Sequence, residues 1–170
     1  MKNSVLMTKA TYEDMHNVAQ IIRSSAKWYE KFVEPQDLGE HYVDDVWKKK
    51  NYKKREFYLC HHESGEKIGT LSLEHFKNFS YLGYVYLDLD YVGHGYGQYI
   101  LKYAKELTKS NGKSRMILMA HPEAKWAIKA YKKFGFKKIY EKKEEVCSFE
   151  NNVLASYYEE GFHLYEFKLT

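Results

Sequence analysis

The chain has 170 residues, of which 44% are hydrophobic and 29% charged, and this composition excludes a disordered tail or a proline-rich linker. Lys and Arg exceed Asp and Glu by 27 to 23, an excess too small and dispersed for a dedicated nucleic-acid-binding protein. Cys60 and Cys147 lie far apart, the N-terminus lacks the apolar stretch of a secretory signal, and no run approaches the ~20 apolar residues of a membrane span. We therefore expect one cytoplasmic domain over residues 1–170, with no nucleic-acid partner and no membrane partner.

The first part of the chain is predicted to form a strand and two helices. Residues 5–10 form the strand, and Thr11 with Asp14 can cap the first helix, whose apolar residues recur at helical spacing. Asp37, followed three residues later by Glu40, is predicted to begin the second helix. The apolar positions of this second helix are Leu38, Tyr42, Val43, Val46 and Trp47.

The rest of the chain alternates strands and helices after an initial meander. The predicted meander strands are residues 56–62, 67–76 and 81–90, and the elements after them are a helix at 97–111, a strand at 115–120, a helix at 123–134 and strands at 136–140 and 162–169. Three consecutive strands before the first glycine-rich loop do not fit a doubly wound fold. We expect a mixed α/β fold, with a central, largely antiparallel sheet of six to seven strands flanked by about four helices.

A glycine-rich segment, Val92-Gly93-His94-Gly95-Tyr96-Gly97-Gln98, joins the third meander strand to a helix. Without Cβ atoms the backbone N–H groups can approach an anion, and the helix N-terminus adds donors and the positive end of its dipole. A pyrophosphate fits such a loop. The segment lacks the Gly-Lys-Ser/Thr ending of a P-loop, and its GxGxG spacing differs from the GxGxxG of a dinucleotide-binding fold. A tight turn that uses glycine for its geometry alone is the alternative.

A second motif follows one helix and one strand later, with the sequence Ala127-Ile128-Lys129-Ala130-Tyr131-Lys132-Lys133-Phe134-Gly135-Phe136. Together the two motifs resemble the GNAT superfamily of N-acetyltransferases, whose pyrophosphate loop is Gln/Arg-x-x-Gly-x-Gly/Ala and whose later helix carries Ala-x-x-x-Tyr-x-x-x-Gly-Phe. The resemblance covers residues 81–139 at the level of motifs. It implies an acetyl-CoA-dependent enzyme that transfers an acetyl group to a primary amine by direct attack.

The resemblance also assigns residues to the cofactor, acetyl-CoA. A strand segment would pair with the pantetheine arm and polarise the thioester carbonyl, and the glycine loop would hold the pyrophosphate. The cofactor residues implied in this way are Leu87, Asp88, Leu89, Gly93, His94, Gly95, Tyr96, Gly97, Gln98, Ala124 and Tyr131. Val92 and Ala124 depart from the family pattern, where Gln or Arg and Asn are usual. These departures motivate an alternative function, a catalytically silent CoA-binding regulatory module.

Two residues are candidates for proton transfer. The resemblance places Tyr131 beside the CoA sulfur, where its phenol, a neutral donor with a pKa of ~10, would protonate the departing thiolate. A core tyrosine on an apolar helix face is the alternative. Some family members have a Glu near the start of the 81–90 strand, whereas this chain has Tyr81-Leu82-Gly83-Tyr84 there. His121 is the candidate general base, with Asp88 and Glu74 as alternatives.

The acceptor is predicted less sharply than the cofactor. In the family the first two helices and the last hairpin shape the acceptor side, and aromatic rings with carboxylates there suit a cationic amine. The residues concerned are Trp28, Tyr29, Phe32, Glu34, Asp37, Glu40, Tyr42, Asp44 and Asp45. A polyamine or another small cationic amine is the first expectation, and protein amines and aminoglycosides stay open. A basic patch at residues 48–55 is predicted to be a solvated helix end and loop, and a binding patch for CoA phosphates, an acidic partner or a nucleic acid is the alternative. A homodimer through the aromatic C-terminal segment is a further expectation, with a buried strand as the alternative.

Overall fold

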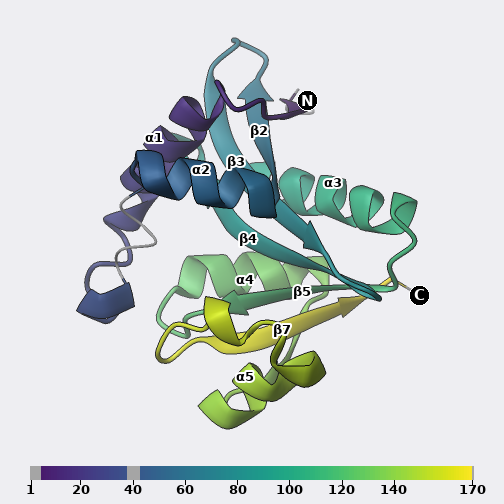
Figure 1. The fold of residues 1–170 in the computed structure, drawn as a ribbon. Coiled ribbons are helices and arrows are strands. Elements are labelled where there is room, and N and C mark those ends of the chain that lie inside the picture. Colours follow the sequence, from purple (N-terminus) through teal and green to yellow (C-terminus); the bar gives the residue numbers. More distant parts are fainter. Residues whose placement is uncertain (1–4, 38–42, 170) are drawn as a thin grey trace.

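The strands form one sheet in the computed structural model, which describes residues 5–37 and 43–169 (Figure 1). Seven described strands lie in the order β1-β2-β3-β4-β5-β7-β6, and among their pairs only β4–β5 is parallel. The strands are β1 (Val5–Lys9), β2 (Glu56–His62), β3 (Lys67–His75), β4 (Phe79–Leu87), β5 (Arg115–Ala120), β6 (Lys137–Tyr140) and β7 (His163–Lys168). The predicted mixed, largely antiparallel sheet is therefore confirmed.

Five α-helices flank this sheet in the described residues, where about four were expected. They are α1 (Met15–Ala26), α2 (Asp45–Lys54), α3 (Tyr96–Ser110), α4 (Lys125–Phe134) and α5 (Lys143–Asn152). The additional helix is α5, in which Val146 and Phe149 are the buried side chains and the last turn departs from helical geometry. A short, kinked helix with so few apolar residues has no continuous apolar stripe, and its sequence therefore shows no helical period.

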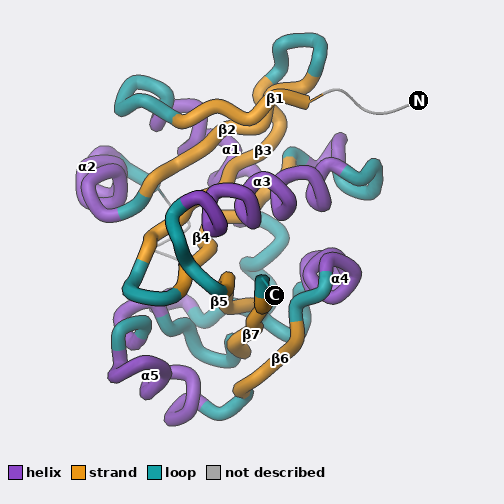
Figure 2. Tube along the Cα trace, turned by 90° about the vertical axis from the view of Figure 1, so that its right-hand side faces the viewer, coloured by secondary structure: helices purple, strands orange, loops and turns teal. Residues whose placement is uncertain are grey.

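The helices cover both faces of the sheet, with α1 and α2 on one side and α3 and α4 on the other (Figures 1 and 2). The alternation of β2 shows how the sequence supports two cores. Phe57 and Leu59 pack with α1 and α2, whereas Tyr58 and Cys60 pack with α3. Because successive side chains of a strand point to opposite faces, the consecutive buried residues 57–60 in the middle of β2 can serve both layers.

The sheet opens between β4 and β5. These strands pair in register from Phe79 with Arg115 to Leu82 with Leu118, and β4 then continues to Leu87 while pairing with β3. A register shift in the β3–β4 pair and the positive φ of Tyr84 (48°) mark a bulge at the point of separation. Backbone groups of β4 beyond Leu82 are therefore exposed to a space between two strands of one sheet.

The boundaries of two predicted elements need correction. β4 ends at Leu87, and Leu89–Tyr91 is a 3-10 helix, so Asp88 and Leu89 are not part of a strand. α2 begins at Asp45, with the Asp44 carboxylate accepting from the Trp47 N–H at 2.8 Å, and not at Asp37. The predicted helical positions Leu38, Glu40 and Tyr42 lie outside the described residues.

The aromatic residues of the C-terminal segment contact other parts of the same chain. Tyr165 and Phe162 are buried. The Phe167 ring lies so close to Gly135 that a Cβ there would be 3.0 Å from it. Packing within the fold therefore accounts for these rings, and the expected homodimer remains a prediction.

Candidate active site

Two cavities meet at the opening between β4 and β5. The larger, of about 380 Å³, lies between the glycine-rich loop, α3 and α4, and we term it the loop cavity. The smaller, of about 250 Å³, lies between β4, the α1–α2 connection and the segment before β7, and we term it the aromatic cavity. Both are lined by Tyr29, Val85, Tyr86, Ala127 and Tyr131. A molecule in one cavity can therefore reach a molecule in the other.

The glycine loop has the backbone geometry of an anion site. Gly93 and Gly95 have φ values of 89° and 88°, in the left-handed region that favours glycine, and both line the loop cavity. Added Cβ atoms would meet nothing within 4 Å, so the space in front of the loop is open. Gly95 is the residue before α3, whose first N–H groups have no partner within the helix. The loop and the helix N-terminus can together hold a pyrophosphate.

The other predicted loop residues have different surroundings. Gly97 and Gln98 line the loop cavity, but the Gln98 side chain donates to the Ala130 carbonyl at 2.9 Å and so joins α3 to α4. The Tyr96 side chain is buried in the core, and the His94 side chain is exposed and lines neither cavity. Tyr96 and His94 therefore offer backbone groups, not side chains, to a ligand in the loop cavity.

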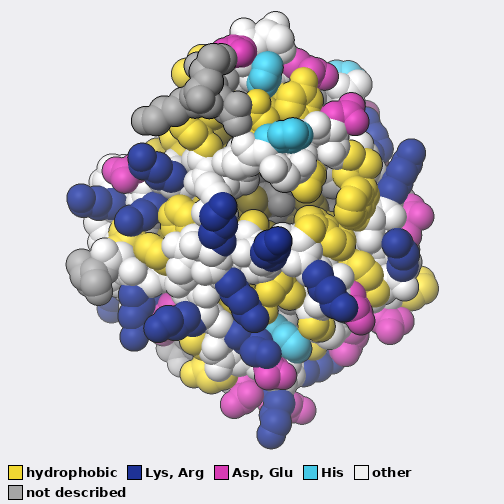
Figure 3. Space-filling view, turned by 180° about the vertical axis from the view of Figure 1, so that it is seen from behind, with side chains coloured by type: hydrophobic (Ala, Val, Ile, Leu, Met, Phe, Trp, Pro, Cys, Tyr) yellow, Lys and Arg dark blue, Asp and Glu magenta, His cyan; other side chains and the backbone are white. Residues whose placement is uncertain are grey.

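Two cationic residues that the sequence did not single out also line the loop cavity. Lys129 and Lys133 are four residues apart on α4 and so lie on one face of that helix. On this side of the molecule, Lys and Arg side chains gather beside a hollow with apolar walls (Figure 3). Val92, which occupies the place of the usual Gln or Arg, contributes to these walls. The α4 lysines can therefore supply the positive charge that Val92 does not.

The strand edge that faces the opening is two residues earlier than predicted. The Asp88 N–H donates to the Ile68 carbonyl at 2.7 Å, on the β3 side, and the Asp88 carboxylate accepts from the Asp90 N–H at 3.1 Å. Because successive backbone groups of a strand point to opposite sides, Leu87 and Val85 direct theirs toward the opening. Both line the loop cavity. Leu87 and Leu89 therefore line the loop cavity, whereas the Asp88 N–H is bonded on the β3 side.

Ala124, one of the predicted cofactor residues, lies in a packed part of the structure. It is 1% exposed and packs with Tyr29, Val33 and Phe162, directly before α4. Neither cavity is lined by Ala124. A methyl group lacks the reach of the usual Asn amide, so this position contributes packing between α4 and the α1–α2 connection.

Tyr131 lies where the two cavities join. The side chain is 8% exposed and contacts both spaces, and its burial raises the pKa of the phenol well above its ordinary value. Gly135 ends α4 and Phe136 packs edge-on against the Tyr131 ring, with centroids 5.9 Å apart. These contacts fix the ring orientation, so the hydroxyl is a positioned donor that keeps its proton at neutral pH.

His121 lines the aromatic cavity, but its hydrogen bonding does not suit a base. The Glu123 N–H donates to His121 Nδ1 at 3.1 Å, which assigns the ring proton to Nε2. Burial lowers the pKa of His121, and the ring is stacked on Phe32 with centroids 4.4 Å apart. The lone pair that a base needs is already used by the backbone. The geometry favours a neutral, packed imidazole over the predicted general base.

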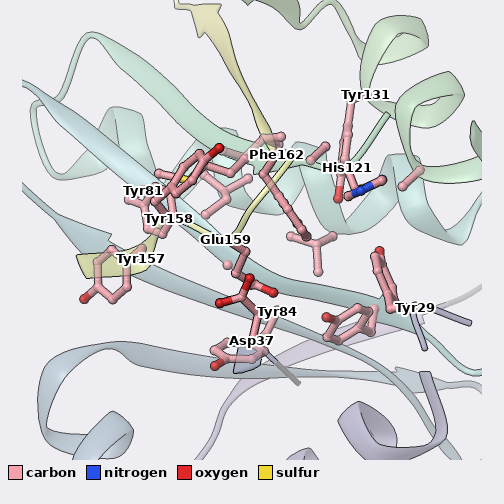
Figure 4. Close-up of a pocket in the computed structure, with 18 of the residues that line it drawn as sticks. Tyr29, Asp37, Tyr81, Tyr84, His121, Tyr131, Tyr157, Tyr158, Glu159 and Phe162 are labelled. Carbon is pink, nitrogen blue, oxygen red and sulfur yellow. The ribbon is translucent and has the colours of Figure 1, made fainter. Parts of the chain in front are cut away.

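Carboxylates from two distant segments also line the aromatic cavity. Asp37 lies in the α1–α2 connection and Glu159 precedes β7, and both face the space between the rings (Figure 4). Burial is the main cause of the raised pKa of Tyr29, Tyr81 and Tyr86, and the Glu159 carboxylate adds to each shift. The negative charge of Glu159 therefore acts across the aromatic cavity.

The remaining acidic candidates have other partners. Glu74 accepts a short hydrogen bond from the Tyr157 hydroxyl, and Asp45 pairs with Lys48 at 2.8 Å. Neither of them, nor Asp88 or Asp44, lines the two cavities. Among the predicted acceptor residues, Tyr29 and Asp37 reach the aromatic cavity, and Glu40 and Tyr42 lie outside the described residues. Glu159 was missed because the segment around it has no helical or strand period.

Comparison with known proteins gives one family and many structures. The profile described as "Acetyltransferase (GNAT) family" matches residues 20–136. No curated protein matches the chain significantly in sequence. No helix in the described part of the chain is long and apolar enough to cross a membrane.

Solved structures share the fold at low sequence identity. PaiA N-acetyltransferase from Thermoplasma acidophilum, in complex with coenzyme A, has a TM-score of 0.76 and 19% identity over 97% of this chain and 99% of its own. A GNAT-family acetyltransferase from Staphylococcus aureus has a TM-score of 0.72 and 15% identity, over 98% of this chain and 100% of its own. Ribosomal-protein-S5-alanine acetyltransferase from Vibrio fischeri has a TM-score of 0.70 and 15% identity, over 99% of this chain and 94% of its own. With the family profile covering most of the chain and its glycine loop, this protein belongs to the GNAT family of acetyl-CoA-dependent N-acetyltransferases.

Proposed function

We propose that the chain acetylates a small primary amine bound in the aromatic cavity, by direct attack on acetyl-CoA bound in the loop cavity. The observation that carries this proposal is the junction of the two cavities at Tyr131. An anion-binding loop lies on one side of this junction and carboxylates lie on the other. Direct transfer needs both reactants within contact of each other, and a shared wall supports that arrangement.

The residues of the loop cavity fit coenzyme A. Gly93, Gly95 and the first turn of α3 would hold the pyrophosphate, and Lys129 and Lys133 would pair with phosphate oxygens. The backbone of Val85 and Leu87 would pair with the amide groups of the pantetheine arm in the manner of an added strand. Acetyl-CoA supplies an acetyl group activated as a thioester.

Tyr131 would hold the proton that the leaving thiolate needs. Its raised pKa keeps the phenol protonated, and its position between the cavities places the hydroxyl near the junction. A backbone N–H of β4 that faces the opening would stabilise negative charge on the carbonyl oxygen. The proton that Tyr131 donates is replaced from solvent after the reaction.

Glu159 and Asp37 would hold the incoming amine. A primary ammonium has a pKa of ~10.4 and must lose a proton before its nitrogen can attack. Glu159 is the carboxylate whose charge acts across the aromatic cavity, so we assign it the role of accepting that proton, directly or through water. The aromatic rings of the cavity add cation–π contacts to the bound ammonium.

The acceptor is a small cationic amine by this proposal, and polyamines and exposed protein amines remain in that class. The volume of about 250 Å³ is below the ~300–1,000 Å³ that is usual for a ligand pocket, and this favours a small molecule or a single side chain. The silent CoA-binding module is the competing function. It predicts CoA binding without acetyl transfer to any amine.

A matched pair of variants tests the proposal. Glu159→Gln removes the charge inside the cavity, whereas Glu160→Gln removes a neighbouring exposed charge that pairs with Lys143 at 3.0 Å. Thiol release from acetyl-CoA with a panel of primary amines should fall about 100-fold in kcat/KM in the first variant and change little in the second. Equal activity of the wild type and both variants would show that Glu159 takes no part in the reaction. Absence of turnover in the wild type, with CoA bound, would support the silent module.

A further inference from the structure

A buried arginine, Arg55, lines the aromatic cavity together with Glu159 and Asp37. Arg55 follows α2 and is 9% exposed, whereas its neighbours Lys53 and Lys54 are exposed. Its backbone N–H ends α2 by donating to the Asn51 carbonyl at 2.9 Å. The residue that follows, Glu56, begins β2, so Arg55 is held between two regular elements. Its side chain is therefore directed inward by the fold.

The guanidinium of Arg55 lies between two aromatic rings. Its Cζ is 4.8 Å from the centroid of Tyr84 and 4.4 Å from that of Tyr157. It makes no hydrogen bond or ion pair to the described residues, and its Nε is fully buried without a partner. Cation–π contacts offset part of the cost of burying a charge, but a guanidinium in a cavity wall is normally paired with an anion. Arg55 therefore has unused capacity to bind a carboxylate.

Gly83 shows that the chain makes room for this group. A Cβ at Gly83 would lie 2.5 Å from Arg55 Nη1 and 3.0 Å from Ser72 Oγ, so a side chain there would displace the guanidinium from its present position. Gly83 is in β4, in the stretch Tyr81–Tyr84 where the sequence offered no carboxylate for a base. Its missing side chain is replaced by the guanidinium. The Arg55 guanidinium thus occupies, in the wall of the aromatic cavity, the space that a side chain at position 83 of β4 would take.

We infer that the acceptor carries a carboxylate besides its amine, so that Arg55 binds the carboxylate while Glu159 and Asp37 face the amine. The substrate class is then an amino acid. This inference rests on the proposed function, because it names the acceptor of the same reaction. Among the described residues the cavity offers one cation and two carboxylates, which matches a zwitterion, whereas a polyamine would leave Arg55 without an anion and add positive charges beside it. Planar guanidinium and carboxylate groups can form two parallel hydrogen bonds, which fixes the orientation of the bound molecule.

Pairs of acceptors that differ by one carboxylate test the inference without any mutation. L-Ornithine and putrescine form one pair, L-lysine and cadaverine a second, and L-phenylalanine and 2-phenylethylamine a third. Acetyl transfer, measured as thiol release, should have a kcat/KM about 10- to 100-fold higher for the amino acid in each pair that reacts. Equal or better use of the amines without a carboxylate would overturn the inference. If putrescine had the highest kcat/KM of these acceptors, a polyamine would be favoured as the acceptor instead.

Two variants test whether Arg55 causes the preference for acceptors that carry a carboxylate. Arg55→Met should abolish the ratio between the members of a pair, mainly through KM, and Arg55→Lys should restore part of it. Lys54→Met is the matched control, because its Nζ lies 4.2 Å from the Tyr157 centroid but outside both cavities. A purely structural role for Arg55 would lower activity with both members of a pair equally and leave the ratio intact. That result would overturn the inference even if the wild type prefers amino acids.

A binding measurement separates the inference from the proposed function. L-Phenylalanine, N-acetyl-L-phenylalanine and 2-phenylethylamine are titrated by calorimetry into the protein saturated with CoA, and likewise the ornithine pair. If no amine is acetylated but the carboxylates bind and Arg55→Met abolishes that binding, the proposed function fails and the carboxylate site stands. If amines are acetylated but neither turnover nor binding depends on the carboxylate, the carboxylate site fails and the proposed function stands.

Discussion

The loop cavity and the aromatic cavity share a wall but are built from different parts of the chain. The loop cavity combines the glycine-rich segment, residues 92–98, with residues of α3, α4, β4 and the end of α1. The aromatic cavity depends on side chains from segments far apart in the sequence: the α1–α2 connection, the start of β2, β4, α4 and the residues before β7. Backbone groups are present whatever the side chains are, whereas side-chain groups change with every substitution.

This difference explains how one fold can keep its cofactor and change its acceptor. A glycine loop before a helix holds a pyrophosphate through N–H groups, so Val92 can replace a polar residue without removing the cradle. No such redundancy exists where Arg55, Glu159 and Tyr157 define the opposite cavity. Changes in the loop cavity should therefore alter cofactor affinity, and changes in the aromatic cavity should alter the choice of acceptor.

Tyr131→Phe tests the junction between the regions and should have the largest effect. Removing the hydroxyl removes the proton donor for the thiolate, so kcat should fall about 10²- to 10⁴-fold while the Kd for CoA stays nearly unchanged. Initial rates of thiol release measure kcat, and calorimetric titration of CoA measures its Kd. Tyr165→Phe is the control, because Tyr165 is also buried but lines neither cavity. A parallel loss in both variants would show a packing defect and not a lost proton donor.

Gly95→Glu tests whether the loop cavity is an anion site. The new carboxylate would extend into the open space before the loop and repel the pyrophosphate, so the Kd for CoA should rise about 100-fold. Gly65→Glu is matched to it, since Gly65 has a φ of 91° and equally open surroundings in the turn between β2 and β3. Both variants carry the same backbone strain, of about 1–2 kcal/mol. Calorimetry should find weakened binding in the first alone.

Lys129→Gln combined with Lys133→Gln should have a smaller effect on the same cavity. Each lysine is solvent-accessible, so its attraction to a phosphate is screened, and the Kd for CoA should rise about 10-fold at low salt and less at high salt. Lys132→Gln removes a charge from the same helix outside the cavity and is the control. A salt-independent loss of binding would mean that the lysines act through helix packing.

The glycine loop and the helix that carries Tyr131 could be predicted from the sequence because their signals are local. The glycine loop and the Tyr131 motif each lie within ten residues, and backbone geometry follows directly from the glycines. The same locality explains the error at Asp88 and Leu89. Their apolar–acidic alternation matches a strand, but the Asp88 carboxylate accepts from the Asp90 N–H and supports a turn that ends β4.

The acceptor side needed the structure because its residues meet only through long-range pairing. Arg55 follows a run of lysines, and the sequence placed it with them in one basic patch. The end of α2 turns the lysines outward and Arg55 inward, which composition cannot reveal. Glu159 joins the cavity because β7 lies beside β5, a contact between segments with no shared motif.

The smallest predicted effect is a change in how the thermal unfolding midpoint depends on pH when a histidine of the aromatic cavity is replaced. Burial lowers the pKa of His121 in the folded chain, with His163 adding to the shift and Glu123 opposing it. The unfolded chain therefore binds a proton more readily, with an ordinary pKa of ~6.5, so stability present above that value is lost as pH falls below it. Thermal unfolding midpoints between pH 7.5 and 5.5 should fall, and His121→Gln should reduce the slope.

His94→Gln applies the same substitution to the other region. The His94 side chain is exposed on the glycine loop and lines neither cavity, so this variant is the comparison for the loss of one imidazole outside the aromatic cavity. If the slope in His121→Gln equals that of the wild type, the imidazole is not held neutral by its contacts with Phe32 and the Glu123 N–H. His121 would then be free to take up a proton, and the role of general base would return to it from Glu159.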